Sequence, residues 1–291
     1  MLLTIDIGNT QSTFGVYASD ELQATWRIST RAGATPDELL VLLGALLSAR
    51  ALALPDIKAV CLGSVVPELT RAWIGACAAA ELPVPLLPAQ IAPRDLGLTS
   101  AQAGVVGADR LANAVAARAR YGAPAVVVDF GTATNLDVID GEGHFIGGPI
   151  SAGLELSAEA LYAQAARLAA VELAAPSRII AQTTEDALRA GLVVGEAAKV
   201  DGLVIRIAEE LADSSGPADR MGSGTVLSFD DKTVPDPILS AGLLTGLPVV
   251  ATGGLAPLIA PHSWTITTCD TSLTLDGLHL LARDALRGEQ A

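Results

Sequence analysis

The sequence predicts an α/β protein built from two similar halves, and three observations support this. Short apolar segments of strand length alternate with longer segments whose apolar residues recur at helical spacing. An apolar strand followed by aspartate, one residue and glycine occurs twice, at Ile5–Thr10 and Val128–Ala133. Of the 291 residues, 51% are hydrophobic, which suffices for a large buried core. We place the halves at residues 1–122 and 123–291, with an insertion at 214–246.

The first half is predicted to open with strands and to continue with helices. Thr35 and Pro36 form a helix start, because threonine caps the first turn and proline fits the first helical position. The periodicity predicts strands at residues 2–7, 12–17, 22–28 and 57–63, and helices at residues 36–51, 67–80 and 106–121.

The second half repeats this order of elements. Its first strand is wholly apolar, which is typical of a strand buried on both faces. Asp140–Gly143 carries the glycines of a turn and predicts a hairpin. The same order in both halves favours a duplication. We expect strands at residues 125–129, 135–139, 144–150, 225–229 and 249–252, and helices at residues 152–170, 184–211 and 273–287.

Composition excludes several classes of partner. The chain has 32 acidic and 18 basic residues, a formal net charge of −14. A chain this acidic is poorly suited to nucleic acid or an anionic membrane surface, so we expect neither as a partner. An anionic substrate would be held locally, by arginine, a metal ion or backbone N–H groups. We find no apolar run of about 18 residues and no signal-peptide pattern, and we expect a cytoplasmic protein.

The cysteines and histidines form no recognisable motif. The three cysteines are widely spaced, so we expect free, buried thiols rather than a zinc site or a disulfide framework. The three histidines lie in contexts typical of the surface. There is no Gly-x-Ser-x-Gly sequence, which argues against a serine hydrolase. The residues concerned are Cys61, Cys77, Cys269, His144, His262 and His279.

Asp6 and Asp129 are candidate functional carboxylates. Each closes an apolar strand before a glycine turn, and either one alone is explained as a residue that caps the turn. If the two halves pack face to face, both carboxylates enter one cleft, where they could hold a cation. The glycines would let backbone N–H groups approach a phosphate, with hydroxyls from Thr10, Ser12 and Thr132. Neither a P-loop nor a Rossmann fingerprint is present.

A second candidate is Gly107–Arg110, at the start of the predicted helix 106–121. Asp109 there complements the helix dipole, which is a purely structural explanation. Arg110 is less well placed at a positive helix end unless an anion lies nearby. A helix N-terminus with an arginine is suited to a carboxylate or a phosphate.

Taken together, these residues resemble the type III pantothenate kinases, a branch of the acetate-kinase, sugar-kinase and actin-like ATPase superfamily. The resemblance runs along nearly the whole chain in family order. Its segments are Asp6–Thr10, Gly107–Arg110, Asp129–Thr134, Gly147–Ile150, Thr184, Thr252–Ala256 and Leu273–Leu278.

The resemblance implies a duplicated ribonuclease-H-like fold, a homodimer, and ATP-dependent phosphorylation of pantothenate, the first step towards coenzyme A. It implies Mg²⁺ with ATP and a monovalent cation, K⁺ or NH₄⁺. Asp109 would be the general base, Asp6 would hold Mg²⁺ and Asp129 the monovalent ion. The residues implied for ATP are Asp6, Ile7, Gly8, Asn9, Thr10, Gln11, Ser12, Thr13 and Thr132, and those for pantothenate are Gly107, Ala108, Asp109, Arg110 and Thr184.

The chain departs from the family pattern on the acceptor side. No aromatic residue occurs in residues 95–106, where the family usually has a tyrosine. Ala152 replaces a proline, and Asn135 replaces the threonine that usually follows Thr134. Two alternatives therefore stay open beside pantothenate kinase: a kinase of the same fold for another small hydroxylated acceptor, and a non-catalytic nucleotide-binding regulator.

Overall fold

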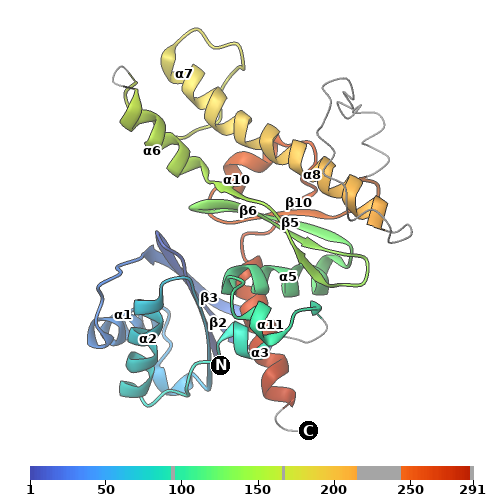
Figure 1. Cartoon of the computed structure of the whole chain (residues 1–291). Helices are drawn as coiled ribbons and strands as arrows, with labels where there is room; N and C mark the ends of the chain where they lie inside the picture. The colour runs from blue at the N-terminus through green and yellow to red at the C-terminus, as the bar shows by residue number, and fades with distance from the viewer. Residues whose placement is uncertain (93–95, 166–167, 215–243, 289–291) are drawn as a thin grey trace. The chain divides into compact units, whose positions relative to one another are not determined.

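The computed structural model describes residues 1–92, 96–165, 168–214 and 244–288 (Figure 1). The predicted strand at 225–229 and most of the predicted insertion lie outside these ranges. The chain forms two compact units, neither of which is one continuous stretch. Unit 1 comprises residues 1–122, 143–149 and 270–291, and unit 2 comprises residues 123–142 and 150–269.

Unit 1 contains a four-stranded sheet in the order β3-β2-β1-β4. The first three strands are antiparallel neighbours, and β4 runs parallel to β1. An isolated parallel bridge between Cys61 and Leu86 extends the sheet beyond β4. The strands are β1 (Leu2–Ile7), β2 (Gln11–Ala18), β3 (Glu21–Ser29) and β4 (Ala59–Ser64).

Helices cover both faces of the unit 1 sheet (Figure 1). One face packs on α1 and α2, and Phe14 and Trp73 meet in this core at a ring-centroid distance of 5.4 Å. The predicted start of α1 is confirmed, since Thr35 and Glu38 form a capping box. The helices are α1 (Pro36–Ser48), α2 (Pro67–Ala79), α3 (Pro88–Ile91), α4 (Ser100–Ala103), α5 (Ala108–Tyr121) and α11 (Leu273–Gly288), with a 3₁₀ turn at Leu54–Asp56.

Unit 2 repeats the strand arrangement of unit 1. Its central strand β5 is antiparallel to β6 and parallel to β9, β8 is antiparallel to β6, and β10 is parallel to β9. Unit 1 has the same arrangement around its central strand. The strand β5 corresponds to β1, β6 to β2, β9 to β4, β8 to β3, and β10 to the bridge at Leu86. The repeat confirms the predicted duplicated ribonuclease-H-like α/β fold. The strands are β5 (Ala125–Phe130), β6 (Ala133–Ile139), β8 (Ile150–Ala152), β9 (Val249–Thr252) and β10 (Thr268–Cys269), and β7 (Phe145–Gly147) clusters with unit 1.

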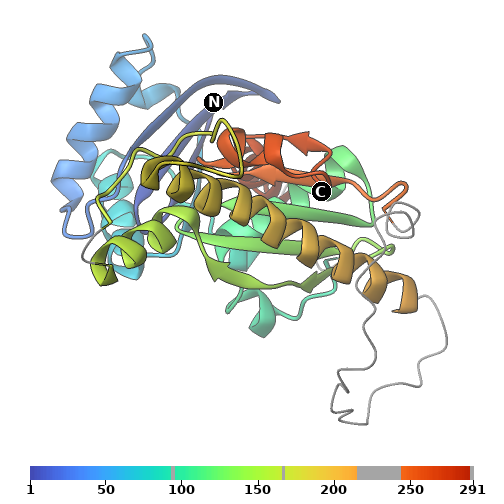
Figure 2. The same cartoon turned by 90° about the horizontal axis from the view of Figure 1, so that it is seen from above.

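The long helix α8 lies along one face of the unit 2 sheet (Figure 2). Val193, Ala197, Val200 and Val204 recur at helical spacing and pack on the apolar residues of β5, β6 and β9. A π-helical turn at Ala190–Val194 joins α7 to α8. The helices are α6 (Leu154–Gln164), α7 (Thr184–Arg189), α8 (Gly195–Ser214) and α10 (Ala256–Ile259), with a 3₁₀ turn at Ala260–His262.

Four local predictions are corrected by the structure. The predicted strand at 144–150 is divided into β7 and β8, because Gly147 and Gly148 take positive φ angles of 104° and 138°. The helix predicted to reach residue 170 ends at Gln164. Cys269 is exposed rather than buried. His279 is buried and stacks on Tyr17 with ring centroids 4.3 Å apart.

A polar network joins α5 and α11 within unit 1. Arg120 bonds both Asp270 and Asp276, at 2.7 and 2.8 Å. Tyr121 donates to Asp270, and Tyr17 on β2 donates to Asp276. Burial acts to raise the pKa of Asp270, but hydrogen bonds from Tyr121 and Arg120 bring the net value below its usual range. The network fixes α11 against both α5 and the sheet.

Two of the predicted free thiols are confirmed as buried. Burial raises the pKa of the Cys61 thiol to about 12 and that of Cys77 to about 11. Within the described ranges, none of the helices combines the length and the apolar character needed to cross a membrane.

Substituting Gly277 tests the close crossing of α5 and α11. A Cβ atom at Gly277 would overlap the carbonyl oxygen of Ala112 on α5. We expect Gly277→Ala to lower the free energy of unfolding by about 1–3 kcal/mol, because the helix backbones must separate. Gly202→Ala on α8 is the matched control, since nothing lies near its added methyl, and it should stabilise by about 0.5–1 kcal/mol. Equal stabilisation of both variants in chemical denaturation would contradict the crossing.

Candidate functional site

The turn after β1 is built by backbone and hydroxyl hydrogen bonds. The N–H of Gly8 donates to the carbonyl of Gln11 at 3.0 Å, which closes the turn. Thr30 donates from its hydroxyl to the carbonyl of Gly8, and Ser12 shares a 2.8 Å hydrogen bond with that hydroxyl. Asn9, Thr10 and Gln11 are exposed, Ile7 and Ser12 are buried, and Asp6, Gly8 and Thr13 are half-buried. The exposed tip therefore stands on a fixed base.

Asp6 lies at the same edge of the unit 1 sheet as the start of α5. In the sheet, Asp6 is in register with Thr13 on one side and Gly63 on the other. A Cβ atom at Gly63 would lie 3.4 Å from the Cβ of Ala108. The first turn of α5 therefore lies within van der Waals range of β4, and the closest atom to such a Cβ would be Cδ2 of Leu278 on α11, at 3.1 Å. Two segments separated by about a hundred residues in the sequence, Asp6–Thr13 and Gly107–Arg110, meet at one edge of unit 1.

Asp109 and Arg110 are oriented by specific contacts in the first turn of α5. Asp109 Oδ1 accepts the N–H of Arg110 at 2.9 Å, which leaves Oδ2 to take a proton. Arg110 Nη2 donates to the carbonyl of Gly148 at 3.2 Å, and its guanidinium lies 5.4 Å from the ring centre of Phe145. The cation–π contact and the carbonyl acceptor restrict the rotation of the guanidinium. A positive group is therefore held at a helix N-terminus, as an anion site requires.

In unit 2, Asp129 occupies the position that Asp6 occupies in unit 1. It is in register with Asn135 on β6 and with Thr252 on β9. A Cβ atom at Gly253 would lie 2.5 Å from Asp129 Oδ1, so glycine is needed to make room for this carboxylate. The buried Oδ1 of Asn135 has no hydrogen-bond partner in the described part of the chain. Leaving a buried amide oxygen without a hydrogen bond costs about 1–3 kcal/mol of folding free energy.

The turn after β5 is held by Gly153. The N–H of Gly131 donates to the carbonyl of Ala133, and the N–H of Gly153 donates to the carbonyl of Thr132 at 3.1 Å. A Cβ atom at Gly153 would overlap the carbonyl oxygens of Gly131 and Thr132. The side chain of Thr132 is exposed at the tip of this turn.

Sequence reasoning missed a buried polar network behind this turn. Glu196 on α8 accepts the Thr134 hydroxyl at 2.7 Å and pairs with Lys199 at 2.8 Å. Lys199 also donates to the carbonyl of Ala152, beside Gly153. The network therefore ties α8 to both β6 and β8. The available signal was a glutamate within the apolar stripe of a helix, three residues before a lysine.

The last predicted binding residue, Thr184, is the exposed first residue of α7. Thr183 before it caps the helix by accepting the N–H of Asp186. The predicted role of Thr184 therefore rests on the resemblance alone.

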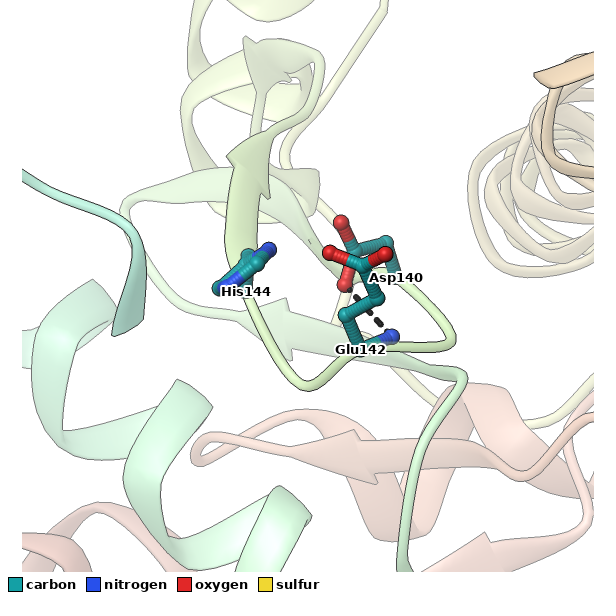
Figure 3. Close-up of side chains that lie close together, drawn as sticks. All are labelled: Asp140, Glu142 and His144. Carbon is teal, nitrogen blue, oxygen red and sulfur yellow. Dashed lines mark hydrogen bonds between the residues drawn. The ribbon is translucent and has the colours of Figure 1, made fainter. Parts of the chain in front are cut away.

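The turn after β6 carries acidic groups that turn formation explains (Figure 3). Asp140 Oδ1 accepts the N–H of Glu142 at 2.9 Å, which is the bond expected when an aspartate caps a turn. His144 belongs to unit 1, where its side chain packs on Gly97. We assign no metal to this turn.

Comparison with known proteins gives consistent results over the whole chain. A family model described as type III pantothenate kinase matches residues 2–206. The chain is 38% identical to the type III pantothenate kinase of Roseiflexus sp. (strain RS-1), covering 97% of this chain and 98% of that protein. It is 39% identical to that of Rubrobacter xylanophilus, covering 97% of each. A solved Baf family protein from Campylobacter jejuni has a TM-score of 0.50 at 18% identity, with 98% of this chain and 99% of that chain covered, and supports the fold alone.

Two glycines with similar backbone angles test the space around Asp129. Gly246 and Gly253 have φ angles of +83° and +89°, but nothing lies near a Cβ atom at Gly246. We expect Gly246→Ala to cost about 1–2 kcal/mol of unfolding free energy, from backbone strain alone. Gly253→Ala should cost a further ~1–3 kcal/mol, because its methyl also displaces Asp129 or Phe130. Chemical denaturation measures both costs, and equal losses would show that the carboxylate has room to move.

Proposed function

The chain belongs to the type III pantothenate kinase family, and from this premise we propose which of its residues bind ATP, bind pantothenate and move the proton. The reaction is the ATP-dependent phosphorylation of pantothenate, which begins coenzyme A biosynthesis. Among the three hypotheses that the sequence leaves open, family membership favours this kinase over another acceptor or a regulator. The observation that carries the residue assignment is the meeting of Asp6–Thr13 and Gly107–Arg110 at one edge of unit 1.

In this proposal, Asp109 is the general base. Its Oδ2 takes the proton of the pantothenate hydroxyl as that oxygen bonds to the γ-phosphorus of ATP. The bond between the γ-phosphorus and the bridging oxygen breaks, and ADP leaves with those electrons. The hydrogen bond from the Arg110 N–H to Oδ1 keeps the carboxylate oriented during this step. Phosphoryl transfer depends mainly on such positioning.

The carboxylate of pantothenate would pair with Arg110. The contacts of its guanidinium with Gly148 and Phe145 limit its rotation before substrate arrives, which lowers the entropy lost on binding. Gly107 and Ala108 would contact pantothenate through their backbone at the N-terminus of α5. Thr184 in unit 2 is proposed as a further pantothenate contact.

ATP would contact the turns that follow the two central strands. In unit 1 the turn within Asp6–Thr13 offers backbone N–H groups and hydroxyls, and in unit 2 Thr132 offers an exposed hydroxyl. Asp6, a half-buried carboxylate beside this turn, has the oxygen donors that Mg²⁺ prefers. Bound with ATP, Mg²⁺ offsets the negative charge of the phosphates.

Asp129 would hold the monovalent cation, K⁺ or NH₄⁺. The glycine at 253 makes the room that this carboxylate needs, and Asn135 and Thr252 place oxygen atoms beside it. A set of oxygen donors is what K⁺ requires in place of its hydration shell. A cytoplasmic location, where ATP is available, fits the proposed reaction.

Replacing Asp109 with asparagine separates catalysis from helix capping. We expect Asp109→Asn to lower kcat by about 10²–10⁴-fold with the KM for ATP unchanged, because only proton transfer is lost. Asp37→Asn, in the first turn of α1, is the matched control. Both variants lose a carboxylate at a helix N-terminus, worth about 0.3–1 kcal/mol, but the control should keep full turnover.

Arg110→Ala completes this experiment. It should mainly raise the KM for pantothenate, since a charge-assisted contact with substrate is removed. Near-wild-type turnover of Asp109→Asn, together with a lowered melting temperature, would refute the general-base assignment.

We also propose that the protein is a homodimer. Unit 2 exposes Ile150 and, on α6, Leu156 and Leu161, with 62%, 46% and 38% of each residue accessible. Exposed apolar side chains grouped on neighbouring elements are typical of an interface.

Sedimentation velocity at micromolar concentration tests the dimer. We expect a mass of two 29.6 kDa chains for the wild type and a shift towards one chain for Leu156→Glu, because a buried charge opposes association. Val41→Glu, at an exposed position on α1, is the control and should leave the mass unchanged. A wild-type protein sedimenting as one chain would exclude the proposal.

A further inference from the structure

The side chain of Asn135 has an unexplained feature. Its Oδ1 atom is buried and has no hydrogen-bond partner among the residues that the structure describes. Buried carbonyl oxygens in folded proteins nearly always accept a hydrogen bond or bind a cation. The oxygen therefore requires a ligand that the described residues do not supply.

The sheet places Asn135 beside Asp129. The two residues are directly paired in the antiparallel ladder of β5 and β6, so their side chains leave the same face of the sheet. Paired Cβ atoms are about 4.5–5.5 Å apart in such a ladder. Thr252, the register partner of Asp129 on β9, puts a buried hydroxyl residue on the other side. Three oxygen-bearing side chains thus form a row across the sheet.

The chemistry of this row favours a cation. A carboxylate and an amide oxygen both present lone pairs, and two such acceptors side by side repel each other unless a positive group lies between them. Thr134, the neighbour of Asn135, points to the opposite face and bonds Glu196 on α8, so it does not serve this oxygen. A Cβ atom at Gly253 would lie 2.5 Å from Asp129 Oδ1, and one at Gly131 would lie 3.8 Å from it, so both glycines lie next to this carboxylate.

We propose that Asn135 Oδ1 is a direct ligand of the monovalent cation, with Asp129 on one side of the ion. This rests on the proposed function, which assigns the cation to Asp129. Asparagine at this position supplies a carbonyl oxygen, whose lone pairs are not shared with a hydroxyl proton.

Cation-dependent stability, measured without turnover, tests this ligand. The wild type, Asn135→Leu and Asn135→Thr are melted in increasing KCl, with choline chloride holding the ionic strength constant, in the presence and absence of Mg·ADP. The melting temperature of the wild type should rise with K⁺, since the ion binds the folded state. Asn135→Leu should weaken K⁺ binding by about tenfold or more, because even indirect metal contacts are worth about 10–100-fold. Asn135→Thr should restore most of the response.

The stability at zero K⁺ separates a ligand from a structural amide. If Asn135 Oδ1 serves the ion, Asn135→Leu melts at or above the wild-type temperature in choline chloride, because it removes an unsatisfied oxygen. If the amide is structural or binds only water, the variant is destabilised equally at every K⁺ concentration, and the proposal fails. Gln23→Leu, at an exposed position on β3, controls for replacing an amide by leucine.

Asp129→Asn distinguishes this proposal from the one on which it rests. Loss of the K⁺ response in Asp129→Asn and retention in Asn135→Leu would overturn only the role of Asn135. Retention in Asp129→Asn would overturn the assignment of the cation to Asp129. A wild type whose melting temperature ignores K⁺, with and without Mg·ADP, would overturn both.

Discussion

The close approach of glycine backbone to the turns after the central strands is the constraint on which the proposed site depends. In unit 2, Gly153 and Gly253 lie so near the Phe130–Thr132 backbone that a single methyl group would displace it. This contact fixes the turn from two sides, while the Glu196–Lys199 pair holds β8 from the face covered by α8. A rigid turn keeps its N–H groups and hydroxyls in place before a phosphate arrives, so little order has to be created on binding.

The negative charge of the chain explains why such fixed groups are needed. With a net charge of −14, the protein repels ATP at long range and cannot depend on a general positive field. Lys199 forms an ion pair with the buried Glu196. Arg110 is positioned by the carbonyl of Gly148 and the ring of Phe145. Attraction for phosphate must then come from backbone dipoles, helix N-termini and bound cations. Bound ions are accordingly integral to substrate affinity as well as to catalysis.

Local chemistry made much of this fold predictable from sequence. The Thr35 cap, the apolar strands and the repeated Asp-x-Gly segment each depend on residues close in the chain, and all were found where expected. The candidate residues Asp109 and Arg110 were found because an arginine at a helix N-terminus conflicts with the dipole.

Features decided by distant contacts were not predictable. The break at Gly147 and Gly148 requires positive φ angles that no local pattern announces. His279 is in a sequence context typical of the surface, but α11 buries it against Tyr17, where Asp20 accepts its Nε2 hydrogen. Glu196 is a charged residue on a helix that packs on the sheet, and the residue that bonds it, Thr134, lies 62 residues earlier in the sequence. Only tertiary pairing reveals such groups.

The two halves share one frame, but the register of their sheets gives the two equivalent carboxylates different neighbours. Asp6 is flanked by Thr13 and Gly63, and at Gly63 the sheet has no side chain and packs against Leu278 of α11 and Ala108 of α5. Asp129 is flanked by Asn135 and Thr252, so the equivalent space holds oxygen donors instead. A carboxylate beside a helix N-terminus is suited to a substrate that brings its own metal ion, whereas a carboxylate between two neutral oxygens is suited to retaining a monovalent ion. Under the proposed assignment, glycine at 63 and threonine at 252, which occupy equivalent register positions, thus distinguish the roles of the two strand ends.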